Sequence, residues 1–183
     1  TVFSQMASET TGISFDKVFI VSTQDTDLTP FDTGAYASRQ SFVTGTAVKE
    51  CAQQLKQKIL EYARTLVPGN VDRLELEDGY ILADGKPAIS LEDLAMESYY
   101  SLSNSSVLTA EVSRQVKKNT VASGCCFAEV EVDMKLGKIK VLDIVNVHDS
   151  GTLLNPQLAA MQVHGGMFMG IGYGVSEQLL IDE

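Results

Sequence analysis

The feature that most constrains this chain is a run of 21 residues, 156–176, without a single Asp, Glu, Lys or Arg. A run of that length can span a bilayer, and three of its glycines recur at four-residue intervals, as in membrane helix packing. However, it contains five glycines in all, no Lys or Arg flanks it, and the polar Gln162 and His164 lie inside it. We therefore expect a helix buried in a large protein rather than a membrane span.

Two readings of the polar residues in this helix remain open. Gln162 and His164 either bond to nearby carbonyl groups or face a buried polar ligand. The glycines allow another helix, or a ligand, to approach the backbone closely.

Composition narrows the class of protein. Hydrophobic residues make up 44% and charged residues 21%, which is typical of a globular protein. The chain carries 24 acidic and 14 basic residues, a net charge of −10. This balance argues against a nucleic-acid partner and against anionic membrane surfaces. The first residue is Thr1, no signal peptide is visible, and the last residues do not resemble the close of a domain. We expect residues 1–183 to be a single fragment of a larger subunit.

The cysteines indicate a reducing compartment. There are three, of which Cys125 and Cys126 are adjacent, and the chain has two histidines. An odd number with neighbours on opposite faces of a strand argues against a disulfide framework, and no Cys/His spacing suits zinc. We expect reduced, buried cysteines in a cytoplasmic protein.

The patterns of apolar residues predict an α+β fold, with mixed or antiparallel hairpins and two long helices. The long helices are those with the clearest boundaries, the first ending before Pro68 and the second opening at Asn155-Pro156. In the first part of the chain we expect a helix over 1–10, a buried strand over 14–22, a loop over 23–36 and a helix from 38–41 to Pro68. A hairpin over 73–83 follows, then a helix over 90–99 opened by a Ser90/Asp93 capping box and a loop over 101–106. In the last part we expect a hairpin over 121–147 with one face buried, a loop over 148–155 and a helix from Pro156 to about Leu180.

Two loops have the composition of functional segments. Residues 34–41 lead from small residues into hydroxyls, Arg39 and a helix start, where free N–H groups and the helix dipole favour an anion such as phosphate. The alternative is an ordinary helix start, capped by Ser38 or Ser41, with Arg39 in solvent. His148-Asp149 has the composition of an acid–base pair, but nothing indicates a nucleophile beside it, so a loop aspartate that accepts hydrogen bonds is the simpler interpretation.

The same segments resemble a known family. Residues 24–41, with Thr44-Gly-Thr-Ala-Val48, are similar to part of the molybdenum-cofactor-binding large subunit of the xanthine dehydrogenase/aldehyde oxidase family. Residues 147–156 and 162–172 resemble a second block of that subunit, and their sequence is close to that of the bacterial xanthine dehydrogenase branch of the family. The hairpin between them also fits, so the resemblance covers nearly the whole chain.

The resemblance implies a molybdenum hydroxylase, in which a glutamate base assists the hydroxylation of an electron-poor carbon with oxygen derived from water. Its implied cofactor is a molybdenum–pyranopterin, often the cytosine dinucleotide form in bacteria. Iron–sulfur clusters and FAD are expected on partner subunits or domains, and the implied substrate is a purine such as hypoxanthine or xanthine. A relative acting on another N-heterocycle, an aldehyde or an aromatic acyl thioester remains open, as does a non-catalytic cofactor-delivery or assembly module.

Residue by residue, the resemblance implies a cofactor-binding turn and one further contact near the metal. Gln162 corresponds to the family's glutamine near the metal, and the glycines after it to the family's small positions. The turn is formed by Ala37, Ser38, Arg39, Gln40 and Ser41. No protein ligand to molybdenum is implied.

The family's catalytic glutamate belongs to a Gly-Glu motif beyond the last helix, which neither Glu177 nor Glu183 fits. We therefore expect no catalytic residue in this chain and no turnover by the chain alone.

Overall fold

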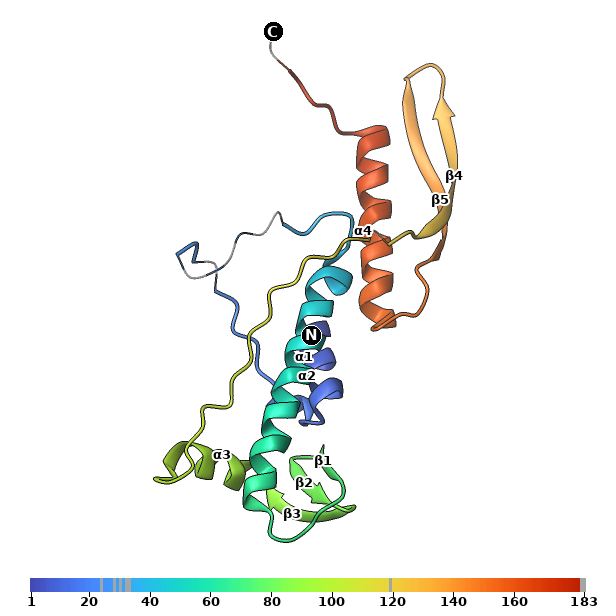
Figure 1. Cartoon of the computed structure of the whole chain (residues 1–183). Coiled ribbons are helices and arrows are strands. Elements are labelled where there is room, and N and C mark those ends of the chain that lie inside the picture. Colours follow the sequence, from blue (N-terminus) through green and yellow to red (C-terminus); the bar gives the residue numbers. More distant parts are fainter. Residues whose placement is uncertain (24, 28, 30, 32–33, 119, 182–183) are drawn as a thin grey trace. The chain divides into compact units, whose positions relative to one another are not determined.

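A computed structural model of the protein describes residues 1–23, 25–27, 29, 31, 34–118 and 120–181. It forms two compact units, Thr1–Lys118 and Asn119–Glu183. Both combine helices with antiparallel strands (Figure 1), so the α+β fold predicted from the sequence is confirmed.

The first unit is built on one long helix, α2. The shorter α1 packs along it, and a three-stranded antiparallel sheet of order β1-β2-β3 lies near its C-terminal end together with α3 (Figure 1). The elements are α1 (Val2–Thr11), the 3-10 helix η1 (Phe15–Lys17), α2 (Gln40–Leu66), β1 (Leu74–Glu77), β2 (Tyr80–Ala83), β3 (Lys86–Ser90) and α3 (Leu91–Tyr100).

The apolar stripe predicted for the long helix forms the core of this unit. Its C-terminal half packs against the inner side chains of the sheet and of α3, where Ile81 and Leu94 are completely buried. Burial of such side chains is the main term that stabilises a domain of this size. The buried cluster consists of Ile59, Tyr62, Ala63, Leu74, Leu76, Ile81 and Leu94.

Local sequence signals account for the sheet and for α3. Asp78 and Gly79 turn β1 into β2 with φ values of 46° and 79°, as the Asp-Gly pair predicts. The Ser90 hydroxyl accepts a hydrogen bond from the N–H of Asp93 at 3.0 Å and donates one to the carboxylate of Asp93 at 2.6 Å, which confirms the predicted cap at Ser90. Strand β3 was not predicted from the sequence. It follows a second Asp-Gly turn and contains Pro87. Because β3 pairs only with β2, this residue without an N–H stands on an edge strand.

The predicted buried strand over 14–22 is wrong. Residues Phe15–Lys17 form the 3-10 helix instead, and the side chains of Phe19 and Val21 are 82% and 86% exposed. A strand needs a neighbour to satisfy its backbone groups. Within the described residues this segment has none, so its β-rich composition alone does not make a strand.

An extended segment, residues 107–118, completes the first unit by lying against α2. The thiol of Cys51 donates to the carbonyl of Ala110 at 3.2 Å, and the ammonium of Lys58 donates to the carbonyl of Thr109 at 2.6 Å. Further along, Arg114 forms an ion pair with Glu50. The segment is therefore attached to the helix along its length without any regular structure of its own.

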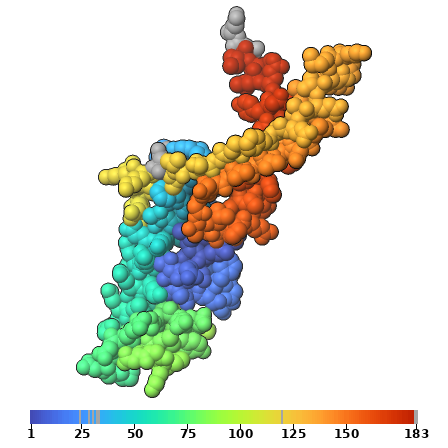
Figure 2. All heavy atoms as spheres, turned by 90° about the vertical axis from the view of Figure 1, so that its right-hand side faces the viewer, coloured from blue at the N-terminus to red at the C-terminus, as the bar shows by residue number. Residues whose placement is uncertain are grey.

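The second unit is a long hairpin that carries one helix. Strands β4 (Ser123–Asp133) and β5 (Lys138–Asp149) pair antiparallel, and α4 (Pro156–Val175) packs on β5 (Figure 1). The carboxylate of Asp133 accepts the N–H groups of Lys135 and Leu136, and Gly137 has a φ of 65°. Figure 2 shows the hairpin as a narrow arm.

A β-bulge in this hairpin changes which side chains face α4. Ala128 pairs with Ile144, but Val130 pairs with Val141, so β5 holds one extra residue between these pairs. The half-buried residues of β5 are consequently Asn146, Ile144 and Val141, with spacings of two and then three. The opposite face stays exposed, so the predicted burial of one face is confirmed only in part.

Helix α4 begins as predicted but ends earlier. The side chain of Asn155 accepts the N–H of Leu158 at 3.0 Å, with Pro156 in the first turn. The helix ends at Val175 rather than near Leu180. The N–H groups of residues 176 and 177 both donate to the carbonyl of Gly172, which closes the last turn. Among the described residues, no helix combines the length and apolar character that crossing a bilayer requires.

The cysteines are free, but the expectation of burial is wrong for two of them. Cys51 is half-buried, whereas Cys125 and Cys126 are exposed. The two neighbours lie on β4, where every residue is exposed, because α4 packs mainly on β5.

Gly12 joins the first helix to the sheet at very close range. It has a φ of 85°, a conformation that favours glycine, and a Cβ atom there would lie 2.1 Å from the carbonyl oxygen of Leu76. Gly69 has a similar φ of 93° but open space around the corresponding position. The two glycines therefore share the same backbone requirement and differ in what surrounds them.

We predict that Gly12→Ala lowers the free energy of unfolding by about 2–4 kcal/mol, because backbone strain adds to a clash with a main-chain atom that cannot move aside. Gly69→Ala is the matched control and should cost only about 1 kcal/mol, from backbone strain. Denaturant unfolding followed by circular dichroism measures both. Equal losses in the two variants would show that the Leu76 contact has no energetic effect.

Tyr62 carries a buried hydroxyl in the core. Its side chain is 6% exposed, and its oxygen has no hydrogen-bond partner among the described residues. Burial, and then the nearby carboxylate of Glu97, raise the pKa of Tyr62 above its usual value of 10. Since the folded pKa exceeds the unfolded one, ionisation of this tyrosine favours the unfolded state, so stability is constant below pH 10 with respect to this group and falls as the pH rises further.

Tyr62→Phe should therefore leave the protein as stable or more stable at pH 7 and should flatten its loss of stability above pH 10. Unfolding midpoints measured between pH 7 and pH 11 test both points. Tyr99→Phe, which changes a side chain that is 71% exposed, is the control. A steep alkaline loss that persists in Tyr62→Phe would refute this role.

Candidate functional site

The residues singled out before the long helix form one sharp turn. Gly34 has a φ of 94°, and Ala37 and Ser38 have φ values of 53° and 52°. Two consecutive left-handed residues other than glycine are uncommon and carry backbone strain. They reverse the chain immediately before Arg39, the N-cap residue of α2.

This turn places an aromatic ring against the arginine. The guanidinium carbon of Arg39 lies 3.8 Å from the centre of the Tyr36 ring, and the N–H of Arg39 donates to the carbonyl of Tyr36 at 3.3 Å. Tyr36 was not among the residues predicted from the sequence. The only signal was an aromatic residue three positions before the arginine, which indicates a stacked pair only once the turn conformation is known.

The start of α2 is arranged to attract an anion. The side chain of its N-cap residue, Arg39, forms no capping hydrogen bond, and its first turn contains no acidic residue. The carbonyl of Arg39 accepts the N–H groups of Phe42 and Val43, so the hydrogen bonds of the helix begin there. A helix N-terminus is electropositive because of its free N–H groups and the helix dipole, and a guanidinium beside it adds to that positive charge.

All five residues predicted for this turn lie together. Arg39 and Gln40 are half-buried, whereas Ala37, Ser38 and Ser41 are exposed. The amide oxygen of Gln40 accepts from the hydroxyl of Thr44 at 2.7 Å. The N-cap residue of the helix is Arg39 rather than Ser38 or Ser41, and the guanidinium of Arg39 stacks on a ring. The turn presents hydroxyl, guanidinium and main-chain N–H groups, a donor set that suits phosphate oxygens.

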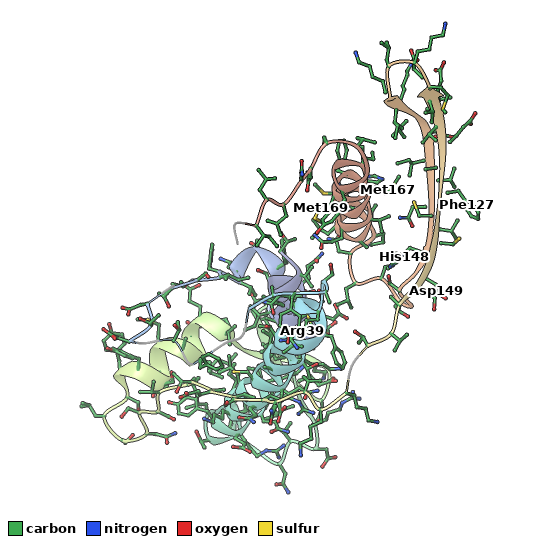
Figure 3. The ribbon with its side chains drawn as sticks, turned by 90° about the horizontal axis from the view of Figure 1, so that it is seen from above. Arg39, Phe127, His148, Asp149, Met167 and Met169 are labelled. Atoms are coloured by element: carbon green, nitrogen blue, oxygen red, sulfur yellow. The ribbon has the colours of Figure 1, made fainter. Side chains whose placement is uncertain are left out.

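The other predicted residue, Gln162, belongs to the second unit. It is exposed on α4, as is His164. A Cβ atom added at Gly165 or Gly166 would have nothing within 4 Å, so this stretch of helix backbone is open to close approach. Figure 3 shows that Met167 of the same helix points toward the hairpin and that Met169 points away from it.

His148 and Asp149 lie at the end of β5, so the expected loop begins two residues later than predicted (Figure 3). The carboxylate of Asp149 accepts the N–H of Gly151 at 2.9 Å, as expected of an aspartate that stabilises a turn. His148 packs over Gly124, where a Cβ atom would lie 2.7 Å from its Nδ1. Within the described part of the chain, no cluster of three or more His, Cys, Asp or Glu side chains is arranged to hold a metal.

Sequence comparison gives a match over the whole chain. A family model described as the molybdopterin cofactor-binding domain matches residues 1–183. The xanthine dehydrogenase molybdenum-binding subunit of Escherichia coli O157:H7 is 46% identical and aligns with 100% of this chain and 25% of its own length. The nicotine 6-hydroxylase large subunit of Paenarthrobacter nicotinovorans is 26% identical, with 100% and 23% covered. The chain thus spans about a quarter of the length of these curated relatives.

Solved structures share the fold. Quinoline 2-oxidoreductase from Pseudomonas putida 86 superposes with a TM-score of 0.79 at 24% identity, over 100% of this chain and 24% of that one. Reconstituted CO dehydrogenase from Oligotropha carboxidovorans gives a TM-score of 0.73 at 27% identity, over 91% and 21%.

The family model covers every residue, and the 46% identical relative aligns along the full chain. The chain belongs to the molybdopterin cofactor-binding domain family of molybdenum-dependent oxidoreductases.

Proposed function

We propose that this chain is part of the cofactor-binding domain of a molybdenum hydroxylase of the xanthine dehydrogenase type, with residues 1–183 forming a single piece of that domain. The observation that carries the proposal is the strained turn before α2, with Arg39 stacked on Tyr36 at the helix start, in a chain that matches the molybdopterin-binding family throughout. A purine or a related N-heterocycle is the proposed substrate. The chain is 46% identical to a xanthine dehydrogenase subunit and 26% identical to the nicotine 6-hydroxylase subunit, which supports a purine over a nicotine-like substrate.

The residues of the turn fit the phosphate end of a molybdenum–pyranopterin, in either its mononucleotide or its cytosine dinucleotide form. In this proposal Ser38 and Ser41 donate hydroxyl hydrogen bonds, Arg39 gives a bidentate charged contact, and Gln40 adds its amide. The small Ala37 leaves the approach to the backbone open. When bound, the molybdenum–pyranopterin supplies the redox chemistry of the hydroxylation.

The second unit contributes Gln162 in this proposal. It stands on a helix surface where Gly165 and Gly166 leave the backbone accessible, so that a bulky group can lie close while the amide of Gln162 donates or accepts a hydrogen bond.

We expect the catalytic base to lie in another segment of the enzyme. Glu177 does not suit the role, because its carboxylate folds back over Gly172 at the end of α4, where a Cβ atom would meet it at 2.1 Å. The isolated chain should therefore bind cofactor weakly and should not hydroxylate xanthine.

The proposal includes partners and a compartment. Iron–sulfur and FAD-containing subunits or domains would carry electrons away from the cofactor, in keeping with relatives named as parts of larger complexes, such as a dehydrogenase complex subunit gamma. Three free cysteines, two of them exposed, are consistent with the reducing cytoplasm.

The first test is the molybdenum and pterin content of the full-length polypeptide, purified with its native partners. We expect about one molybdenum per polypeptide. Arg39→Ala should weaken cofactor retention by more than about tenfold, because a hydrogen bond to a charged group contributes about 1.5–3 kcal/mol. Gln162→Ala should also lower the molybdenum content. Elemental mass spectrometry and pterin fluorescence measure both losses.

Matched controls separate these effects from folding. Arg73 lies on the surface, with a side chain that is 74% exposed, so Arg73→Ala should keep full cofactor content. Gln157→Ala changes an exposed glutamine in the first turn of the helix that carries Gln162, and it is the control for Gln162→Ala. Unchanged metal in both site variants would refute the site. No molybdenum in the parent, in cells that load other molybdenum enzymes, would favour an assembly module.

A further inference from the structure

The contact between Tyr36 and Arg39 has no role in the site as described so far. Tyr36 is 55% exposed and Arg39 is half-buried, and the ring covers one face of the guanidinium at 3.8 Å. Cation–π pairs at exposed positions are weak individually, but they orient the groups that form them.

The Tyr36 ring covers the face of the Arg39 guanidinium and not its edge. All five N–H groups of a guanidinium lie in its plane and point outward from its edge. A ring against the face therefore blocks none of them, and the edge can still form two parallel hydrogen bonds with a phosphate. An unsupported arginine would lose rotamer freedom on binding, and a stacked one has already lost part of it.

The backbone of the turn maintains this contact. Ala37 and Ser38, both left-handed, return the chain so that Tyr36 and Arg39 meet, and the N–H of Arg39 bonds to the carbonyl of Tyr36 at 3.3 Å. Strained conformations persist when the surrounding structure over-determines them. The hydrogen bond and the stacked ring are two such constraints on the same four residues.

We propose that Tyr36 is a positioning residue that holds the Arg39 guanidinium in orientation for the phosphate end of the pterin cofactor. This inference rests on the proposed function. The aromatic ring performs the role, and its hydroxyl is not required.

The test uses the full-length polypeptide with its native partners and follows release of the pterin cofactor after dilution into buffers of increasing inorganic phosphate. Tyr36→Leu keeps an apolar side chain but removes the ring, and it should weaken cofactor retention about two- to fivefold. Tyr36→Phe keeps the ring and should retain cofactor as the parent does. Equal loss in both variants, or no loss in Tyr36→Leu, would overturn the inference.

A double-mutant cycle with Arg39 tests whether Tyr36 acts through the arginine. In an Arg39→Met background, Tyr36→Leu should have no further effect on retention, and the unfolding midpoint should be the same with either residue at position 36. Fully additive losses would mean that Tyr36 contacts the cofactor itself or supports the fold, and the positioning role would be wrong.

The outcomes separate this inference from the proposed function. If the parent holds molybdenum and Arg39→Met loses it while Tyr36→Leu does not, the function stands and the inference fails. If the parent, from cells competent in cofactor synthesis, contains neither molybdenum nor pterin, the proposed function fails and the inference fails with it.

Discussion

The first unit depends on the burial of one face of the C-terminal half of α2 against the small sheet and α3. A helix of 27 residues is roughly 40 Å long and does not hold its conformation in water without such packing. The core at Ile59 and Ala63 stabilises a rigid rod whose opposite end carries Arg39. The helix thus joins a predominantly apolar core near its C-terminal end to the polar turn that carries Arg39 at its start.

Much of the fold follows from local sequence signals. The capping box at Ser90, the cap at Asn155 and the Asp-Gly turn at residues 78–79 each predicted the boundary that the structure has. The failures share a different cause. The run at residues 14–22 and the end of α4 depend on what surrounds the chain: a strand requires a neighbour, and the last turn of α4 closes through the carbonyl of Gly172.

The site was predictable in its residues and not in its geometry. Hydroxyls, an arginine and a helix start in sequence already indicate an anion-binding turn, and the family resemblance adds Gln162. The stack of Tyr36 on Arg39 depends on left-handed φ angles at Ala37 and Ser38, which these residue types rarely adopt. No sequence pattern reports a strained backbone at alanine or serine, so this part of the site could come only from the structure.

The bulge in the hairpin determines which side chains near the tip of β5 face α4. It shifts the alternation of β5 so that Val141 and Ile144 both meet α4, while Lys138 and Lys140 fall on the opposite face. A regular ladder over the same residues would instead continue the inward alternation of Asn146 and Ile144 through residues 142, 140 and 138, which would turn both lysines toward the helix. Deletion of one residue at 142 or 143 would also remove the bulge, but Val141 would then follow Ile144 at a spacing of two and both lysines would stay on the outer face. The extra residue therefore corrects the phase of a strand whose two halves alternate out of step, and loss of the bulge is compatible with the apolar inner face only when it is accompanied by loss of one residue.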